Sequence, residues 1–147
     1  EIPFLQFSSG DVKIVPVIIG EDYKNCADKI KKAIDKIGRK CCFIVSSDLT
    51  HYGINYGFMP FDSEIQKKMY ELNKGAIDNI TRIDSYGFLN YVEETGATIC
   101  GKYPIACFLE LAKSFGHDKA RLLKYYTSGD IVGDYNNSVG YASILIE

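Results

Sequence analysis

Apolar positions along the chain follow two patterns. Short β-branched runs are typical of buried strands, and longer stretches with an apolar residue every three or four positions are typical of helices. The runs predict strands at residues 12–19, 41–46, 122–127 and 139–146. The longer stretches predict helices at residues 25–37, 62–73, 84–94 and 104–116. Strands and helices alternate over the first part of the chain, which is typical of an α/β domain. We therefore expect one α/β domain over residues 1–147.

The first three predicted elements form a strand–helix–strand unit. The first strand reads VKIVPVII and stops at Gly20, and the helix stops at Gly38. Glycine commonly ends a helix because it takes the left-handed conformation without strain. Strand–helix–strand units place their two strands parallel, with a right-handed crossover. A mostly parallel or mixed sheet flanked by helices is the expected architecture.

Composition and charge exclude some classes of function. Apolar residues make up 46% and charged residues 24% of the chain, as in ordinary soluble proteins. The net charge of −2 predicts no nucleic-acid or anionic-membrane partner. No apolar run approaches the ~20 residues of a membrane span. The five cysteines are an odd number and include an adjacent pair, which predicts reduced thiols in the cytoplasm.

The first candidate site is the segment SSDLTHYG, residues 46–53, which follows the second predicted strand. Ligands of α/β sheets bind beyond the carboxyl ends of the strands. Asp48 and His51 are therefore placed where catalytic groups tend to lie. The alternative is that Asp48 caps a turn and His51 is an ordinary packed or surface side chain.

The second candidate site is the segment ATICGKYPI, residues 97–105. Cys100 comes just before Gly101 and a proline that opens a predicted helix. The positive end of a helix dipole favours the thiolate, which attacks electrophiles and binds metals. Gly101 would permit a close approach of the backbone. The alternative is that Cys100 is a small buried apolar residue, like Cys41, Cys42 and Cys107.

The third candidate site is the segment YYTSGDIVGDYNNSVGYAS, residues 125–143, which contains two Gly-Asp pairs. Acidic loops can hold divalent cations through oxygen atoms. The alternative is a connection between two strands built on aspartate turns. Ser128 lies outside any GxSxG motif, so a hydrolase triad has no support, and no P-loop or GxGxxG motif is present.

Taken in order, these three segments resemble the Memo family, whose members are often named protein B of the AmmeMemoRadiSam system. The opening EIPFLQ resembles a further family segment, so the resemblance runs over essentially the whole chain. It implies a fold similar to that of the class III extradiol dioxygenases. Those non-haem iron enzymes hold one iron through two histidines and a carboxylate.

The resemblance also implies roles for individual residues. Cys100 matches the family's metal-binding cysteine, which stands where the dioxygenases have their carboxylate. His51 matches the acid/base histidine of the dioxygenases, and Asp48 is its neighbour in the same pocket. Imidazole exchanges protons near neutral pH, which suits that role.

The two metal-binding histidines of the family lie in its N-terminal half, so the chain matches the C-terminal portion. The other histidine, His117, matches no family position and is expected to be exposed. With Cys100 as its main ligand, the chain is expected to hold iron or copper only weakly, because mononuclear sites usually have three protein ligands. We also expect exposed apolar surface where partner strands are missing.

Two functions follow from the resemblance. The first is a dioxygenase-like redox protein that uses iron or copper; the thiolate favours copper or reduced iron. Its expected partners in prokaryotes are radical-SAM and AMMECR-type proteins. The second is a non-enzymatic binding protein, for which the family implies phosphopeptide recognition. Phosphate binding would favour clustered basic residues, and only Lys40, Lys102 and Lys124 lie near the segments concerned.

Overall fold

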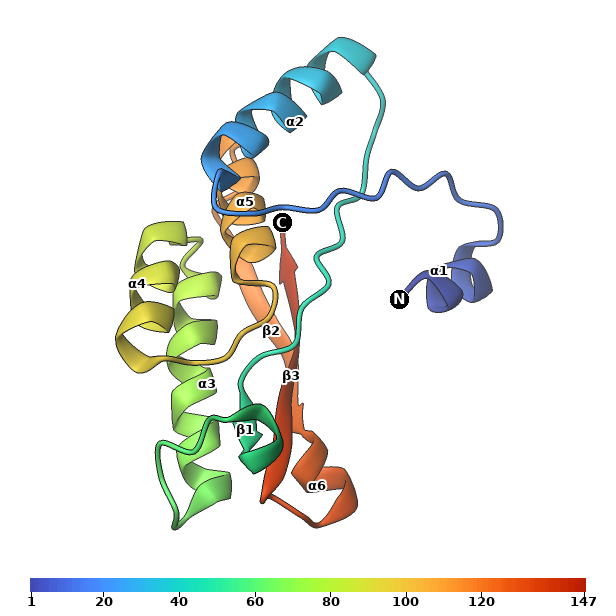
Figure 1. The fold of residues 1–147 in the computed structure, drawn as a ribbon. Helices are drawn as coiled ribbons and strands as arrows, with labels where there is room; N and C mark the ends of the chain where they lie inside the picture. The colour runs from blue at the N-terminus through green and yellow to red at the C-terminus, as the bar shows by residue number, and fades with distance from the viewer.

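Residues 1–147 are described by a computed structural model (Figure 1), which contains helices and a small sheet. The α-helices are α1 (Ile2–Ser9), α2 (Tyr23–Ile37), α3 (Ile65–Thr81), α4 (Ser85–Thr95), α5 (Lys102–Ser114) and α6 (Ser128–Val132). The strands are β1 (His51–Gly53), β2 (Ala120–Thr127) and β3 (Asn137–Ile146), and a 3-10 turn η1 (Ile54–Tyr56) follows β1. The fold class is mixed α and β, as expected.

The sheet has three strands in the order β1-β3-β2, and both pairs are antiparallel. The central strand β3 pairs with β1 through His51 opposite Val139. From Gly140 to Ile146 it pairs with β2, with an irregularity between Leu122 and Lys124. The expected parallel or mixed sheet is therefore wrong for this chain. Strands β2 and β3 are joined by a short connection, which favours an antiparallel pair.

Two predicted strands, residues 12–19 and 41–46, are not strands in the structure. Both segments are outside the helices and strands, and their backbones make no hydrogen bond to another backbone group. A strand requires a neighbour to pair with its N–H and C=O groups, and neither segment has one. Val15 is 85% exposed and Ile18 is fully exposed, so the expected exposed apolar surface is present.

The predicted helices are confirmed, with changed ends. Helix α2 ends at Gly38, which has a left-handed φ of 63°. Helix α4 begins after Asp84, whose carboxylate accepts a hydrogen bond from the N–H of Gly87. Helix α3 begins at Ile65 rather than Asp62 and continues through Gly75. None of the helices has the length and apolar character needed to cross a membrane.

Position 75 in α3 requires a glycine because a side chain of another helix occupies the space beside it. A Cβ at this position would lie 2.3 Å from the ring of Tyr91 in α4. The Tyr91 hydroxyl donates to the carbonyl of Leu72, one turn before Gly75. The glycine therefore serves the packing of α3 on α4 and does not end the helix.

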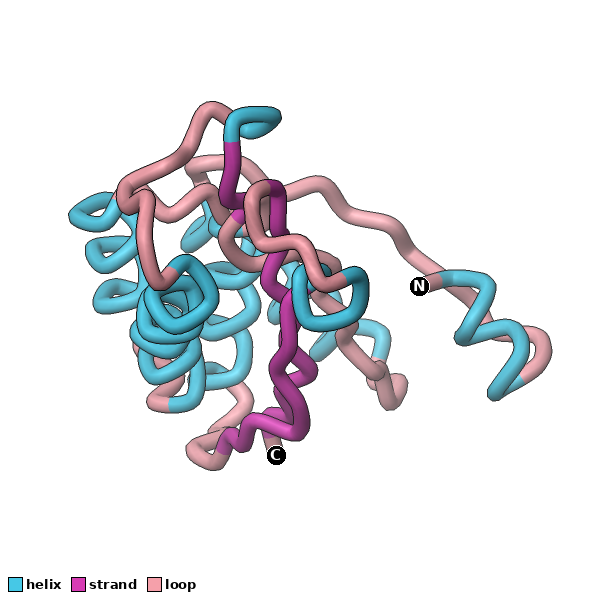
Figure 2. Tube along the Cα trace, turned by 90° about the horizontal axis from the view of Figure 1, so that it is seen from below, coloured by secondary structure: helices cyan, strands magenta, loops and turns pink.

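The core lies between the sheet and helices α3, α4 and α5. Figures 1 and 2 show α3 and α4 together on one side of β3, with α1 well apart on the other side. Twelve buried residues form the main core cluster: Leu49, Ala76, Ile77, Ile80, Ile83, Phe88, Val92, Ala97, Ile99, Ile105, Leu109 and Ala112. Leu49, Ile99 and Ile105 come from the segments that carry the first two candidate sites, so the core holds these segments side by side.

Candidate metal centre

Two segments far apart in sequence meet at the candidate site. Residues 47–51 lead into β1 and are held on β3, since Leu49 donates to the carbonyl of Gly140 (2.9 Å) and Gly140 donates to that of Thr50 (3.0 Å). Residues 97–101 lead into α5. Ala97 and Ile99 are buried while Cys100 is exposed, as expected for an extended segment with alternating faces.

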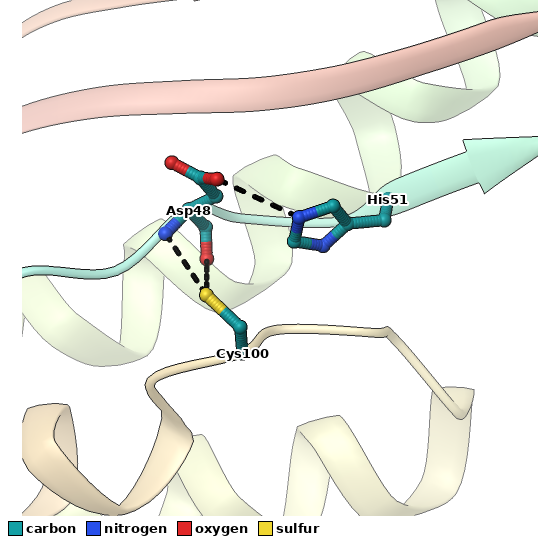
Figure 3. Close-up of side chains that lie close together, drawn as sticks. All are labelled: Asp48, His51 and Cys100. Atoms are coloured by element: carbon teal, nitrogen blue, oxygen red, sulfur yellow. Dashed lines mark hydrogen bonds and ion pairs between the residues drawn. The ribbon is translucent and has the colours of Figure 1, made fainter. Parts of the chain in front are cut away.

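Asp48, His51 and Cys100 lie together, as Figure 3 shows. The carboxylate Oδ2 of Asp48 is 3.5 Å from Nε2 of His51. The backbone N–H of Asp48 donates to Sγ of Cys100 over 3.3 Å. One ligand atom from each of the three residues lies within 4.8 Å of the others. The structure thus unites the three residues singled out from the sequence.

The site opens to solvent mainly at Cys100, whose side chain is exposed. The side chain of Asp48 is 46% exposed and that of His51 is 20% exposed. Cys107 is buried instead, and burial raises the pKa of its thiol to about 11. The alternative reading of Cys100 as a buried apolar residue is therefore wrong. The expected burial of Cys41 and Cys42 is wrong as well, since both are exposed. All five cysteines are free.

Cys100 is held in place by its neighbour Gly101 and by Ser47. The N–H of Gly101 donates to Oγ of Ser47 over 2.9 Å, and that hydroxyl donates to the carbonyl of Asp48 over 2.8 Å. A Cβ at position 101 would lie 2.4 Å from Cβ of Ser47. The close approach of the two segments therefore requires glycine at this position.

Thr98, for which the sequence predicts no role, holds His51. Its hydroxyl accepts from the His51 N–H (2.9 Å) and donates to the His51 carbonyl (2.7 Å). The Thr98 carbonyl lies 2.8 Å from Nδ1 of the imidazole ring. The alternation of apolar and polar residues in ATIC places Thr98 and Cys100 on one face of an extended segment. That alternation was the signal in the sequence.

Tyr56, in η1, lies beside the site, and Tyr141 is part of β3. The ring of Tyr56 lies 5.2 Å from the ring of His51, centroid to centroid. Burial raises the pKa of the Tyr141 hydroxyl, with smaller contributions from Asp48 and Tyr56. The Tyr56 ring therefore packs beside the imidazole while it remains 45% exposed itself.

The third candidate segment is a structural turn. The Asp130 carboxylate accepts hydrogen bonds from the side chains of Tyr70, Tyr135, Gln66 and Thr127, and from the Thr127 N–H. Thr127 and Asp130 form the reciprocal cap of α6. For Asp130 the alternative to a cation site, a connection built on aspartate turns, is confirmed. Its carboxylate oxygens are occupied by hydrogen-bond donors of the protein itself. Asp134 likewise accepts from the backbone N–H and the side chain of Asn136.

The chemistry of the cluster fits a transition metal ion. Protein ligands bind such ions at about 2.0–2.3 Å, so two ligand atoms on one ion are at most about 4.6 Å apart. The observed limit of 4.8 Å is close to this value. A thiolate, an imidazole and a carboxylate together favour iron, copper or zinc over calcium or magnesium. The second histidine, His117, is exposed after α5, as expected, and is not part of the cluster.

Comparisons with known proteins show which family the chain is similar to. Residues 1–145 match the profile of the family described as Memo-like protein. The chain is 34% identical to a MEMO1 family protein of Methanobrevibacter smithii, over 97% of this chain and 48% of the relative. It is 36% identical to one of Pyrobaculum aerophilum, over 99% of this chain and 49% of the relative. The chain thus spans about half the length of these relatives. It belongs to the Memo-like protein family.

Proposed function

We propose that the chain binds a redox-active transition metal, iron or copper, at Asp48, His51 and Cys100. The observation that carries the proposal is the approach of a thiol, an imidazole and a carboxylate to within 4.8 Å of one another. The Cys100 thiolate is the anchoring ligand. Its exposure on the chain surface gives a metal ion direct access.

His51 and Asp48 complete the site in one of two ways. They handle protons beside the metal, as the resemblance to dioxygenases implies, or they are further ligands. A bound iron or copper ion would supply one-electron chemistry that protein side chains do not offer. The imidazole of His51 would accept or deliver a proton at Nε2, which faces Asp48. A dioxygenase-like reaction, with radical-SAM and AMMECR-type proteins as partners, belongs to this proposal.

Anaerobic titration of the chain with iron(II) and with copper(I) tests the proposal. We expect one ion bound per chain, and a loss of affinity of at least about tenfold in Cys100→Ser, because a serine hydroxyl is a poor ligand for soft ions. Cys42→Ser is the matched control, since Cys42 is also exposed and lies outside the cluster. Equal affinities in the two variants would remove Cys100 as the anchoring ligand.

The variant His51→Ala separates the two roles of the histidine. Metal content that stays near the wild-type value, with loss of redox turnover, assigns His51 to proton transfer. Metal content that falls together with that of Cys100→Ser assigns it as a ligand. Asp48→Asn, measured in parallel, distinguishes the same roles for the carboxylate.

The second candidate function is protein binding without catalysis. The exposed apolar side chains of residues 12–19 favour it, because such patches mark interaction surfaces. Phosphopeptide recognition at the cluster has less support, since the Asp48 carboxylate would repel a phosphate. Calorimetry with a phosphotyrosine peptide checks this: binding by a chain that takes up no metal would replace the first proposal with the second.

A further inference from the structure

At His51 the outer edge of β1 is closed by a single side chain. β1 is an edge strand, because β3 is its only neighbouring strand, and its other end, Gly53, forms a bridge with Phe58. The N–H and the C=O of His51 both bond to the hydroxyl of Thr98 (2.9 and 2.7 Å). One hydroxyl can serve both groups because it donates one hydrogen bond and accepts others. Thr98 thus replaces a neighbouring strand at the residue that carries the imidazole.

The same residue determines which ring nitrogen of His51 carries the proton. The Thr98 carbonyl lies 2.8 Å from Nδ1, and a carbonyl only accepts hydrogen bonds. Nδ1 must therefore be the N–H donor. In the neutral ring the lone pair is then on Nε2, the nitrogen that faces Asp48.

This tautomer makes the site suited to a cation. An Nε2 lone pair and the Asp48 carboxylate, 3.5 Å apart, are two acceptors that face each other. Two acceptors repel unless a proton or a metal ion lies close to both. Cys100 adds a third donor atom, and it lies two residues from Thr98 on the same extended segment.

We propose that Thr98 is the positioning residue of the site: it holds His51 in the Nδ1–H tautomer and directs the Nε2 lone pair toward Asp48 and Cys100. Its effect on metal affinity rests on the proposed metal-binding function, whereas its effect on the tautomer does not. Hydrogen bonds to the second nitrogen of metal-binding histidines typically change metal affinity about 10- to 100-fold. The Thr98 hydroxyl holds the His51 backbone where Nδ1 reaches the Thr98 carbonyl, so we expect a loss in this range when the hydroxyl is removed.

Nitrogen NMR of the chain labelled with ¹⁵N-histidine tests the tautomer directly. A His117→Gln background leaves one histidine, and about pH 8 keeps an ordinary imidazole neutral. We expect protonated Nδ1 and unprotonated Nε2 in the unsubstituted site. Thr98→Val keeps the carbonyl that faces Nδ1 but removes the hydroxyl that holds the His51 backbone beside it. We therefore expect the ring to leave the carbonyl for part of the time and to give a mixture of tautomers. Thr98→Ser should restore the original spectrum, since serine keeps the hydroxyl.

Thr81→Val is the control, because the Thr81 hydroxyl bonds only within α3, to the carbonyls of Ile77 and Asp78. A dominant Nε2–H tautomer at the unsubstituted site, or the same tautomer populations with and without Thr98→Val, would overturn the proposal. The first of these outcomes requires no variant, so a folding defect in Thr98→Val does not block the test. Thr98→Ala is the smaller second variant.

Copper(I) affinities of the same proteins separate the two proposals. A 10- to 100-fold loss in Thr98→Val with recovery in Thr98→Ser supports both. If NMR shows the expected tautomers but the chain binds no copper(I), Thr98 remains the positioning residue and the proposed metal function is contradicted. Unchanged copper(I) affinity in Thr98→Val would contradict the consequence for metal binding.

Discussion

Gly101 shows how a single residue controls the position of the Cys100 thiol. The Gly101 backbone lies against Ser47, with no space for a Cβ, and its N–H bonds to the Ser47 hydroxyl. Its φ of −99° is ordinary, so the requirement is one of space and not of conformation. The two segments of the site are in contact because the smallest residue lies between them.

Gly101→Ala should therefore disturb both stability and metal binding. The new methyl would lie 2.4 Å from Cβ of Ser47 and must displace it. Overpacking of this kind costs about 1–3 kcal/mol of unfolding free energy. We expect a loss of that size in urea unfolding, together with weaker copper(I) binding.

Gly20→Ala is the control for this variant, because nothing lies within 4 Å of a Cβ at position 20. It should leave both measurements near the wild-type values. Wild-type stability and copper affinity in Gly101→Ala would show that the two segments can separate without consequence for the site.

At the scale of elements, the turn between β2 and β3 depends on one carboxylate. Burial acts to raise the pKa of Asp130, but hydrogen bonds from Tyr135, Thr127 and Tyr70 outweigh it and hold this pKa far below its usual value. The bond to Asp130, with burial, raises the pKa of Tyr70 to about 12. Helix α6 is therefore stabilised by the ionised form of Asp130.

This arrangement predicts sensitivity to acid. Because the pKa of Asp130 is lower in the folded than in the unfolded chain, its contribution to stability is complete above the unfolded value near 3.8 and is lost as the pH falls below it. Asp130→Asn should be less stable at neutral pH and should lose less stability between about pH 5 and 3. Urea unfolding across this range measures the effect, with Asp118→Asn as an exposed control. Parallel wild-type and Asp130→Asn pH profiles would contradict it.

The helices of the chain were predicted better than its strands because their signals are local. Helices α2 and α4 follow from signals within the helix itself: apolar spacing, Gly38 after α2 and Asp84 before α4. Residues 12–19 and 41–46 carry the composition of strands but lack a paired neighbour. Composition is a property of the segment, whereas pairing depends on a second segment.

At the scale of the whole molecule, apolar surface remains uncovered. Exposed large side chains concentrate near the N-terminal end of the chain: Ile2, Phe4, Phe7, Val12, Ile14, Val15, Val17 and Ile18. Residues 12–18 are all exposed, and unpaired apolar segments of this kind promote association. The chain alone is therefore expected to self-associate.

Ile18→Lys should reduce this self-association without loss of stability. Ile18 is fully exposed, so its replacement removes no packing contact, and the added charge opposes association. Light scattering after size-exclusion chromatography measures the apparent mass, and urea unfolding measures stability. Ile131→Lys is the control, since Ile131 is 70% exposed but lies in α6. An unchanged mass in Ile18→Lys, or an equal change in Ile131→Lys, would show that association does not use residues 12–19.

Local patterns in the sequence specify four of the six α-helices, the family resemblance and the three residues of the candidate metal centre; α1 and α6 were not predicted. These predictions depend on local spacing and on short motifs around Asp48, His51 and Cys100. The folded chain determines which apolar runs become strands, that the sheet is antiparallel, and that Thr98 holds the His51 imidazole. Each of these is a contact between distant segments; Thr98 and His51 are 47 positions apart. Local patterns specify what a segment can form, and the packing of the whole chain selects its partner.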